Sequence, residues 1–445
     1  MKRKNLALKK GLFIAFCAFM LVGCKQQVDE AKLQQLTETA VMDWNSKLTD
    51  VIVADIFTPP VSSRIYAYCN VAAYEVMCKT DTSFQSFAGK LNDLDTTPDP
   101  EEGKEYNFPV AAMVAFSSVG KNLVFNTEAM EKLQSDYLDE IRSTNLNKAT
   151  IENSIAFGNQ MADHIMAWVK KDGYKERSAM SRYQINHNDP GTWQPTPPNY
   201  MEAIEPNWST LRPFTLKASD QFVPAPPTQF DSIPSSQFYK ETMYVYESVN
   251  NLNEENLAKA KFWDCNPNIS YTQGHVMYYK QQISPGGHWI MIACQVAKAE
   301  KLNPMKASEV LAKTAVTIAD AFISCWTAKY ETQLIRPETY INRYIDPDWK
   351  PILQTPAFPE YTSGHSVASS SAATMLTHLL GDNYSFVDST EVNYGLPPRS
   401  FKSFRHAADE AAISRLYGGI HYMPAIKNGV EQGKKVGEHA IAILN

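Results

Sequence analysis

Three short segments near the C-terminal end of the 445-residue chain hold side chains whose types suit anion binding. In chain order they are Lys329-x6-Arg336-Pro337, Ser363-Gly364-His365 and Ser414-Arg415-x5-His421. Together they supply three cations, a hydroxyl, a glycine amide and two imidazoles. Cations neutralise an oxyanion, short donors bridge its oxygens, and an imidazole nitrogen can bond its central atom. The set therefore predicts a site for a tetrahedral oxyanion.

Each segment also has a simpler interpretation when it is taken alone: two solvated cations, an ordinary helix N-cap, or a structural histidine beside a helix end. We expect Lys329 and Arg336, about two helical turns apart, to share one face of a helix that Pro337 ends. Ser363 should begin a helix whose first amides face an anion. Gly418-Gly419 should end another helix, so that His421 turns back towards Arg415.

The three segments in this order resemble the signature of the superfamily that contains type 2 phosphatidic acid phosphatases (PAP2) and vanadium haloperoxidases. Its pattern is Lys-x6-Arg-Pro, then Pro-Ser-Gly-His, then Ser-Arg-x5-His, and the likeness covers roughly residues 240–445. The resemblance implies that five residues hold the equatorial oxygens of the anion: Lys329, Arg336, Ser363, Gly364 and Arg415. It further implies that His421 bonds the phosphorus or vanadium atom and that His365 is the acid–base group at the apical oxygen.

Members of this superfamily perform two kinds of chemistry. Haloperoxidases hold vanadate at the histidine and oxidise halide with hydrogen peroxide, whereas phosphatases need no cofactor and hydrolyse phosphomonoesters through a phosphohistidine. Trp326 and Phe358 match positions where chloroperoxidase-like members place aromatics around the halide, although most such residues simply pack in a core. Asp264 could pair with Arg415 and orient it. We therefore favour a haloperoxidase, with an extracytoplasmic acid phosphatase as the alternative and a non-catalytic surface binding protein as the remote one.

Two positions depart from the family pattern. Thr362 stands where the family usually has proline, and Ala425 stands where many members carry an aspartate four residues after the last histidine. Because that aspartate orients the imidazole, His421 needs another partner here, and a backbone carbonyl is the one we expect.

The N-terminus is typical of a bacterial lipoprotein. A basic stretch over residues 2–10 precedes a short apolar run, and Leu21-Val22-Gly23-Cys24 matches a lipobox. Residues 1–23 are therefore predicted to be a signal peptide and Cys24 the lipidated residue. The expected location is the cell envelope, on the periplasmic or cell-surface side, with the outer membrane as the expected anchor.

Charge and cysteine content narrow the possible partners. Loss of residues 1–23 removes five basic and no acidic residues, which moves the formal net charge from −6 to −11 and argues against nucleic acid as a partner. Small molecules are the expected substrates: peroxide and halide, or a phosphomonoester. The seven cysteines include no CxxC pair, so they suggest neither a zinc finger nor a thioredoxin-like site, and one disulfide is possible.

The rest of the pattern predicts an all-α protein built from helical bundles. Apolar residues recur at helical spacing in a series of segments: about 28–48, 64–77, 110–119, 127–141, 151–168, 237–261, 304–330, 366–380 and 404–417. Ten of the 26 prolines fall in residues 189–234, which should be extended and packed on the body through aromatics. We expect a helical region at 24–188, this connection, and a PAP2/haloperoxidase-like bundle at 235–445 that carries the site. The resemblance also suggests a homodimer.

Overall fold

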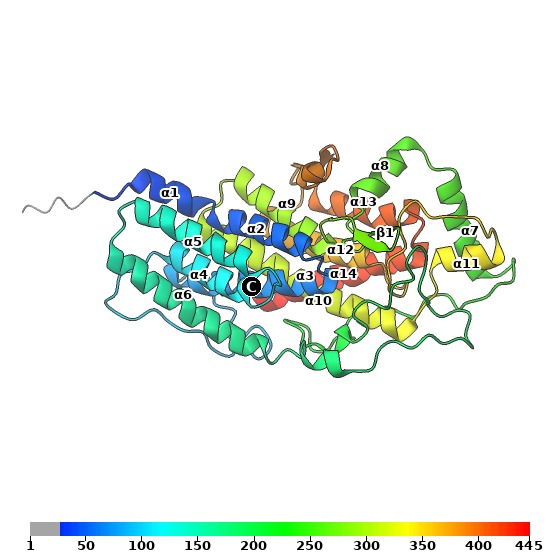
Figure 1. The fold of residues 1–445 in the computed structure, drawn as a ribbon, viewed down its shortest axis with the longest axis horizontal. Helices are drawn as coiled ribbons and strands as arrows, with labels where there is room; N and C mark the ends of the chain where they lie inside the picture. The colour runs from blue at the N-terminus through cyan, green and yellow to red at the C-terminus, as the bar shows by residue number, and fades with distance from the viewer. Residues whose placement is uncertain (1–26) are drawn as a thin grey trace, which may run out of the picture.

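The computed structural model describes residues 27–445, and the predicted signal peptide and Cys24 lie outside them. The protein is all-α, as predicted, and elongated (Figure 1). Its α-helices are α1 (Glu30–Glu38), α2 (Ala40–Ala54), α3 (Pro59–Met77), α4 (Phe108–Lys121), α5 (Thr127–Ser143), α6 (Lys148–Val169), α7 (Gln237–Asn250), α8 (Glu254–Phe262), α9 (Pro285–Ala299), α10 (Pro304–Thr332), α11 (Pro337–Tyr344), α12 (Gly364–Leu380), α13 (Phe404–Tyr417) and α14 (Met423–Leu444).

Two antiparallel strand pairs are the only sheets in the described chain. In the first, β1 (Ser270–Gln273) pairs with β2 (Val276–Tyr279), with Ser270 opposite Tyr279. In the second, β3 (Phe386–Asp388) pairs with β4 (Arg399–Phe401), with Phe386 opposite Phe401.

Helices α3 and α10 pack against each other at the centre of the molecule. On one side, α4 and α6 pack with α3; on the other, α12 and α14 pack with α10 (Figure 1). Helix α10 is long and apolar enough to cross a membrane, but its most apolar 18-residue window is completely buried by the other helices, which identifies it as a core helix. One hydrophobic core includes residues from both halves of the chain. The domain boundaries proposed from the sequence stay a prediction.

A row of three glycines lets α14 lie directly on α12. Gly429, Gly433 and Gly437 are one turn apart, and each faces α12 or the residue before it. A Cβ added at Gly433 would lie 2.2 Å from the carbonyl oxygen of Val367, and one added at Gly429 would lie 3.1 Å from that of Ser363. The backbone amide of Ser363 also donates to the carbonyl of Ala425 at 3.1 Å. The close contact thus fixes the start of α12.

The expected helix shared by Lys329 and Arg336 is wrong. Helix α10 ends at Thr332 because Gln333 adopts a left-handed conformation, with φ +49°. Arg336 is the N-cap of α11, and Pro337 begins that helix instead of ending the previous one. Proline fits the first position of a helix, because its missing N–H would have no partner there, and it also stops a preceding helix. A proline in a sequence can therefore mark either the start or the end of a helix.

The observed helices differ from the predicted ones in two further ways: some predicted segments are divided, and some helices were not predicted. The segments predicted at 28–48 and 237–261 are each divided into two helices, α1 with α2 and α7 with α8. Helices α9, α11 and α14 were not predicted. Helix α9 begins Pro-Gly-Gly, and α14 contains three glycines, so both have weak intrinsic helix propensity.

The proline-rich connection at 189–234 contains, apart from one short turn of 3-10 helix, no regular helix or strand among its residues, all of which are described. It packs on the body through Trp193, Trp208 and Phe214, which are buried. The buried carboxylate of Asp320 on α10 accepts from the backbone amides of Phe214 and Thr215, both at 2.7 Å. These bonds satisfy backbone donors that an irregular buried segment would otherwise leave unpaired.

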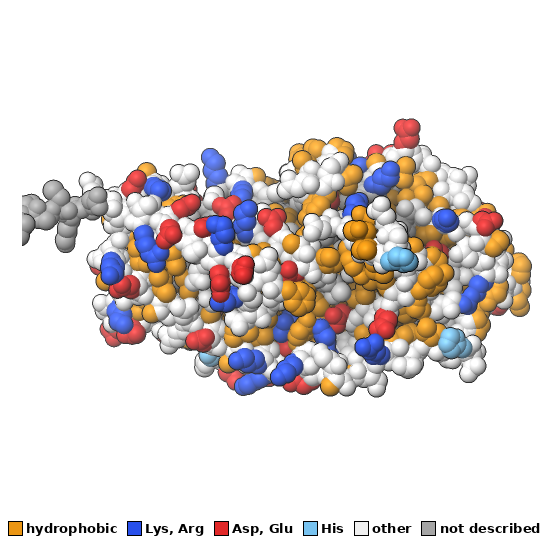
Figure 2. Space-filling model, viewed as in Figure 1, with side chains coloured by type: hydrophobic (Ala, Val, Ile, Leu, Met, Phe, Trp, Pro, Cys, Tyr) orange, Lys and Arg blue, Asp and Glu red, His pale blue; other side chains and the backbone are white. Residues whose placement is uncertain are grey.

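The surface differs between the two ends of the face drawn in Figure 2. Basic and acidic side chains are interspersed over the N-terminal helices, whereas apolar atoms gather around β1 and β2. Tyr271, Val276, Met277 and Tyr278 of this hairpin are exposed. On this face, therefore, charge of one sign does not dominate the N-terminal half.

Replacing Gly433 by alanine should destabilise the protein and loosen the start of α12. The new methyl group cannot fit against the Val367 backbone, so we expect a loss of about 1–3 kcal/mol in the free energy of unfolding. Denaturant unfolding measures this loss. Glu431→Ala, on the exposed face of the same helix, is the control and should change stability by less than about 0.5 kcal/mol. Equal stability of the two variants would contradict the packing argument.

Candidate active site

The fold brings the three predicted segments to one place at the ends of four helices. Lys329 lies in the last turn of α10 and Arg415 in the last turn of α13. Ser363 is the N-cap of α12, and His421 lies between α13 and α14. Gly418-Gly419 ends α13 as predicted, with Gly419 at φ +77°.

Lys329 is completely buried and holds the segment that precedes α12. Its ammonium donates to the carbonyls of Pro359, Glu360 and Thr362 at 3.0, 3.1 and 2.5 Å. Burial and the neighbouring Arg336 together lower the pKa of Lys329 to about 7, against the raising effects of Cys325 and Glu360. The lysine therefore contributes to the site by its charge and by shaping this segment.

Arg336 connects the segment before α12 with the one that follows α13. Its guanidinium donates to the carbonyls of Phe358 at 2.9 Å and Ile420 at 2.8 Å. Nη1 also lies 3.2 Å from Nε2 of His421. Nη2 is buried and has no hydrogen-bond partner in the described chain, so one donor of this cation remains available.

Glu360 is the partner that His421 requires, and the expected backbone carbonyl is wrong. Its Oε1 lies 2.8 Å from Nδ1 of His421 and accepts from the backbone amide of Tyr422 at 2.9 Å. A carboxylate oxygen only accepts, so Nδ1 carries the proton and Nε2 is left with a lone pair. Burial, then Arg336, Lys329 and Arg415, hold the pKa of His421 well below its usual value. His421 is therefore a neutral imidazole whose basic nitrogen lies beside a cation.

The start of α12 presents amides and an imidazole. Ser363 Oγ accepts from the amide of Ser366 at 3.3 Å, which makes Ser363 the N-cap as predicted. The first amides of a helix, here those of Gly364 and His365, have no partner within the helix. Burial and the charge of Arg415 hold the pKa of His365 well below its usual value, and its Nε2 has no hydrogen-bond partner among the described residues.

The backbone carbonyl of Trp263 holds Arg415. Asp264, the residue expected to orient Arg415, directly follows Trp263. Arg415 Nη2 donates to the carbonyl of Trp263 at 2.5 Å, and its Nε donates to Ser414 Oγ at 3.0 Å. Asp264 acts on Arg415 through its charge. Burial raises the pKa of Asp264 to about 6, and the Arg415 charge opposes that rise.

Several of these side chains line a narrow cavity. Gly364, His365, Arg415, His421 and Asp264 are among the residues of its wall. Trp326 and Phe358 line the same cavity, with their ring centroids 4.9 Å apart. Of the other predicted residues, Arg336 contacts His421 and Ser363 directly precedes Gly364.

Phe358 also covers two of the cations. The Lys329 ammonium lies 4.9 Å and the Arg336 guanidinium 5.0 Å from its ring centroid. Two cation–π contacts on one ring stabilise desolvated charges. The aromatic wall therefore has a role in holding the cations as well as in lining the cavity.

Two supporting residues were missed from the sequence. Glu360 lies five residues before His365, where only the nearby motif could have drawn attention to it. Gln432 of α14 accepts from the Thr362 hydroxyl at 2.6 Å and donates to Ser324 at 2.9 Å. Thr362 thus belongs to a buried series of hydrogen bonds that links the segment before α12 to α14 and α10.

Comparisons with known proteins place this geometry in a family. The model of the VCPO second helical-bundle domain matches residues 309–445. A crystal structure of a bacterial vanadium-dependent iodoperoxidase aligns with a TM-score of 0.87 and 46% identity, covering 92% of this chain and 97% of that one. No curated protein sequence matches this chain.

Two structures of a bacterial vanadium-dependent chloroperoxidase share the fold at low identity. The holo form aligns with a TM-score of 0.67 and 16% identity, covering 88% of this chain and 93% of that one. The apo form gives 0.66 and 15%, covering 88% and 95%.

Anion binding should weaken as pH rises above about 7. Deprotonation of Lys329 removes one positive charge from the empty site. Burial raises the pKa of Glu360 to about 7, so its deprotonation adds a negative charge over the same pH range. Both changes disfavour an anion, and each can lower the affinity by up to about tenfold per pH unit. Calorimetric titration with molybdate, whose own charge is constant between pH 6 and 9, measures this slope. In Lys329→Met the slope should become shallower; an unchanged slope would show that Lys329 does not titrate.

Glu360→Gln should weaken anion binding while leaving the fold intact. The amide lacks the negative charge that makes His421 basic, and its NH2 group can turn towards Nδ1. We expect about a 10- to 100-fold loss of vanadate affinity, the usual effect of removing such a partner. Glu338→Gln is the control, because Glu338 is also a buried carboxylate near Arg336 but does not contact His421. Similar affinities in both variants, with unchanged circular dichroism, would contradict the role given to Glu360.

Proposed function

The chain belongs to the vanadium haloperoxidase family, and we propose that iodide is the halide it oxidises with hydrogen peroxide. The observation that carries this proposal is the 46% identity with an iodoperoxidase over 92% of the chain. The cavity supports it, because its walls include Phe322, Trp326 and Phe358. Iodide is the largest and least hydrated of the common halides, so entry into an apolar cavity costs it the least desolvation.

The residues of the site suit vanadate as the resident group. A tetrahedral oxyanion needs cations, short donors and one nitrogen ligand; Arg336 Nη2 and His365 Nε2 are buried donors or acceptors with no partner in the described chain. His421 offers a neutral Nε2, which lies 3.2 Å from Nη1 of Arg336. We assign vanadate to His421, with Lys329, Arg336, Arg415, Ser363 and the Gly364 amide around its oxygens. When bound, vanadate activates peroxide for transfer of an oxygen atom to halide.

The other side chains of the site have separate roles. Glu360 keeps the proton of His421 on Nδ1, so that Nε2 stays available as a ligand. His365, whose pKa lies below its usual value, is neutral at pH 7 and can accept a proton from peroxide at Nε2 as peroxide enters. Trp326 and Phe358 exclude water from the cavity beside it. Exclusion of water strengthens the attraction between the cations and any anion within.

We also propose that the enzyme works in the cell envelope, anchored through a lipid on Cys24. The support is the sequence of residues 2–24 alone. Hydrogen peroxide and iodide would then reach the site from outside the cytoplasm.

Reconstitution with orthovanadate tests the activity. Peroxide-dependent formation of triiodide should appear only after vanadate is added, and it should exceed bromination of phenol red under the same conditions. His421→Ala should lower iodide oxidation by about 10²-fold or more, because the ligand to vanadate is lost. His378→Ala, at the exposed far end of α12, should retain the activity. Faster hydrolysis of p-nitrophenyl phosphate than oxidation of iodide, without vanadate, would instead support a phosphatase.

A further inference from the structure

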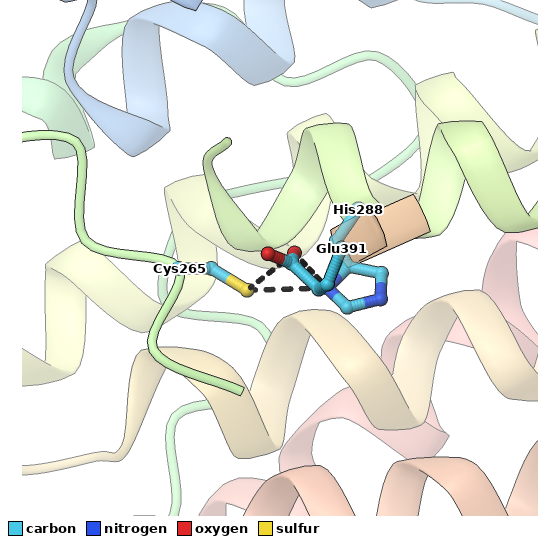
Figure 3. Close-up of side chains that lie close together, drawn as sticks. All are labelled: Cys265, His288 and Glu391. Carbon is cyan, nitrogen blue, oxygen red and sulfur yellow. Dashed lines mark hydrogen bonds and ion pairs between the residues drawn. The ribbon is translucent and has the colours of Figure 1, made fainter. Parts of the chain in front are cut away.

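Cys265, His288 and Glu391 form a second buried cluster that borders the oxyanion cavity. Cys265 lies just after α8, His288 is on α9, and Glu391 lies in a short 3-10 helix that follows β3. All three are at most 4% exposed. Their sulfur, imidazole and carboxylate groups point towards one another (Figure 3). Cys265 is also part of the cavity wall.

The three groups form a triangle around Nδ1 of His288. The Cys265 sulfur lies 3.2 Å from Nδ1, and Oε1 of Glu391 lies 3.1 Å from it. The sulfur and the same carboxylate oxygen are 4.0 Å apart. Without an ion, these contacts form an ion pair between His288 and Glu391 with the Cys265 sulfur beside it. Three ligands of one tetrahedral zinc ion, with bonds of about 2.0–2.3 Å, lie roughly 3.3–3.6 Å apart.

A second carboxylate holds the other nitrogen of the same imidazole. Nε2 of His288 lies 2.7 Å from Oδ2 of Asp388. Oδ1 of Asp388 accepts from the amide and the hydroxyl of Thr390 at 2.9 and 2.7 Å. With Nε2 donating to Asp388, a metal ion that displaces the proton of Nδ1 meets the freed lone pair at the point where the sulfur and Glu391 also lie. A carboxylate behind a histidine in this way is the usual support of a metal-binding imidazole.

We propose that Cys265, His288 and Glu391 bind one zinc ion. Thiolate, imidazole and carboxylate are all established zinc ligands, whereas a thiolate argues against magnesium and calcium. Three protein ligands leave the fourth position of a tetrahedral ion for water. This site is separate from the oxyanion site, since none of its ligands belongs to the motifs that hold vanadate.

The ion would fasten the segment that orients Arg415. The ring of Trp263 stacks on that of His288, with centroids 4.6 Å apart and planes at 20°. The carbonyl of Trp263 accepts from Arg415, and Cys265 follows two residues later. Binding at Cys265 and His288 would therefore hold the Trp263 carbonyl in place. The zinc ion has a structural task in this proposal and no part in oxidation of halide.

Metal content and spectroscopy test the proposal on the purified chain, produced without a histidine tag and freed of vanadate. After treatment with a chelator, addition of zinc should restore about one ion per chain and raise the melting temperature. Addition of cobalt(II) instead should give a near-ultraviolet thiolate charge-transfer band. Cys265→Ser should lose the charge-transfer band, and Glu391→Gln should bind zinc at least about tenfold more weakly.

Cys294→Ala provides the matched control, because Cys294 is a buried free cysteine on the same helix as His288 but lies outside the cluster. It should bind zinc as the unmodified chain does. The proposal would be overturned if the unmodified chain, folded by circular dichroism, took up less than about a tenth of an equivalent of zinc. It would equally be overturned if Cys265→Ser kept the cobalt thiolate band. Neither readout requires vanadate or activity, so failure here is distinct from failure of the haloperoxidase assignment.

Discussion

The arrangement of this site depends on the free-energy cost of desolvating three neighbouring cations. Lys329, Arg336 and Arg415 are each at most 1% exposed. Two acids, Glu360 and Asp264, act on these cations; burial raises the pKa of Glu360 to about 7 and that of Asp264 to about 6, so Glu360 is only partly ionised at pH 7. Buried charges require pairing, and here the protein supplies mostly carbonyl dipoles. An excess of positive charge is therefore left for an anion to neutralise. Burial, together with this charge, holds the pKa of both histidines well below its usual value.

Close packing of the α12 and α14 backbones helps the protein to accommodate these buried cations. Carbonyl groups that hold Lys329 and Arg336 come from residues 358–362 and from Ile420, just before α12 and α14. Those segments keep their positions because the glycines of α14 let it lie on α12 without intervening side chains. The small residues of α12 and α14 thus help to build the site, as do the charged residues at the ends of α10 and α13.

The sequence was sufficient to predict the members of the site but not how they are held. The resemblance to the family signature predicted the seven residues that the fold brings together. Glu360 could not be found in this way, since its pairing with His421 depends on a segment that Lys329 folds. The shared helix face of Lys329 and Arg336 was wrong because the left-handed Gln333 leaves no signal of its own. Helix α14 was missed because glycine favours its packing and opposes its propensity.

Free thiols in an enzyme that would generate oxidised halogen need protection, and the fold provides it by burial. All five cysteines of the described chain are buried and unpaired. Burial raises the pKa of Cys294 to about 12 and that of Cys265 to about 11, so in the absence of a metal both are protonated thiols, which react slowly because the thiolate is the nucleophile. Cys265 alone of these five borders the cavity, and it is also the one whose sulfur lies against an imidazole and a carboxylate. The position of this residue is therefore more readily explained by a bound ion than by packing.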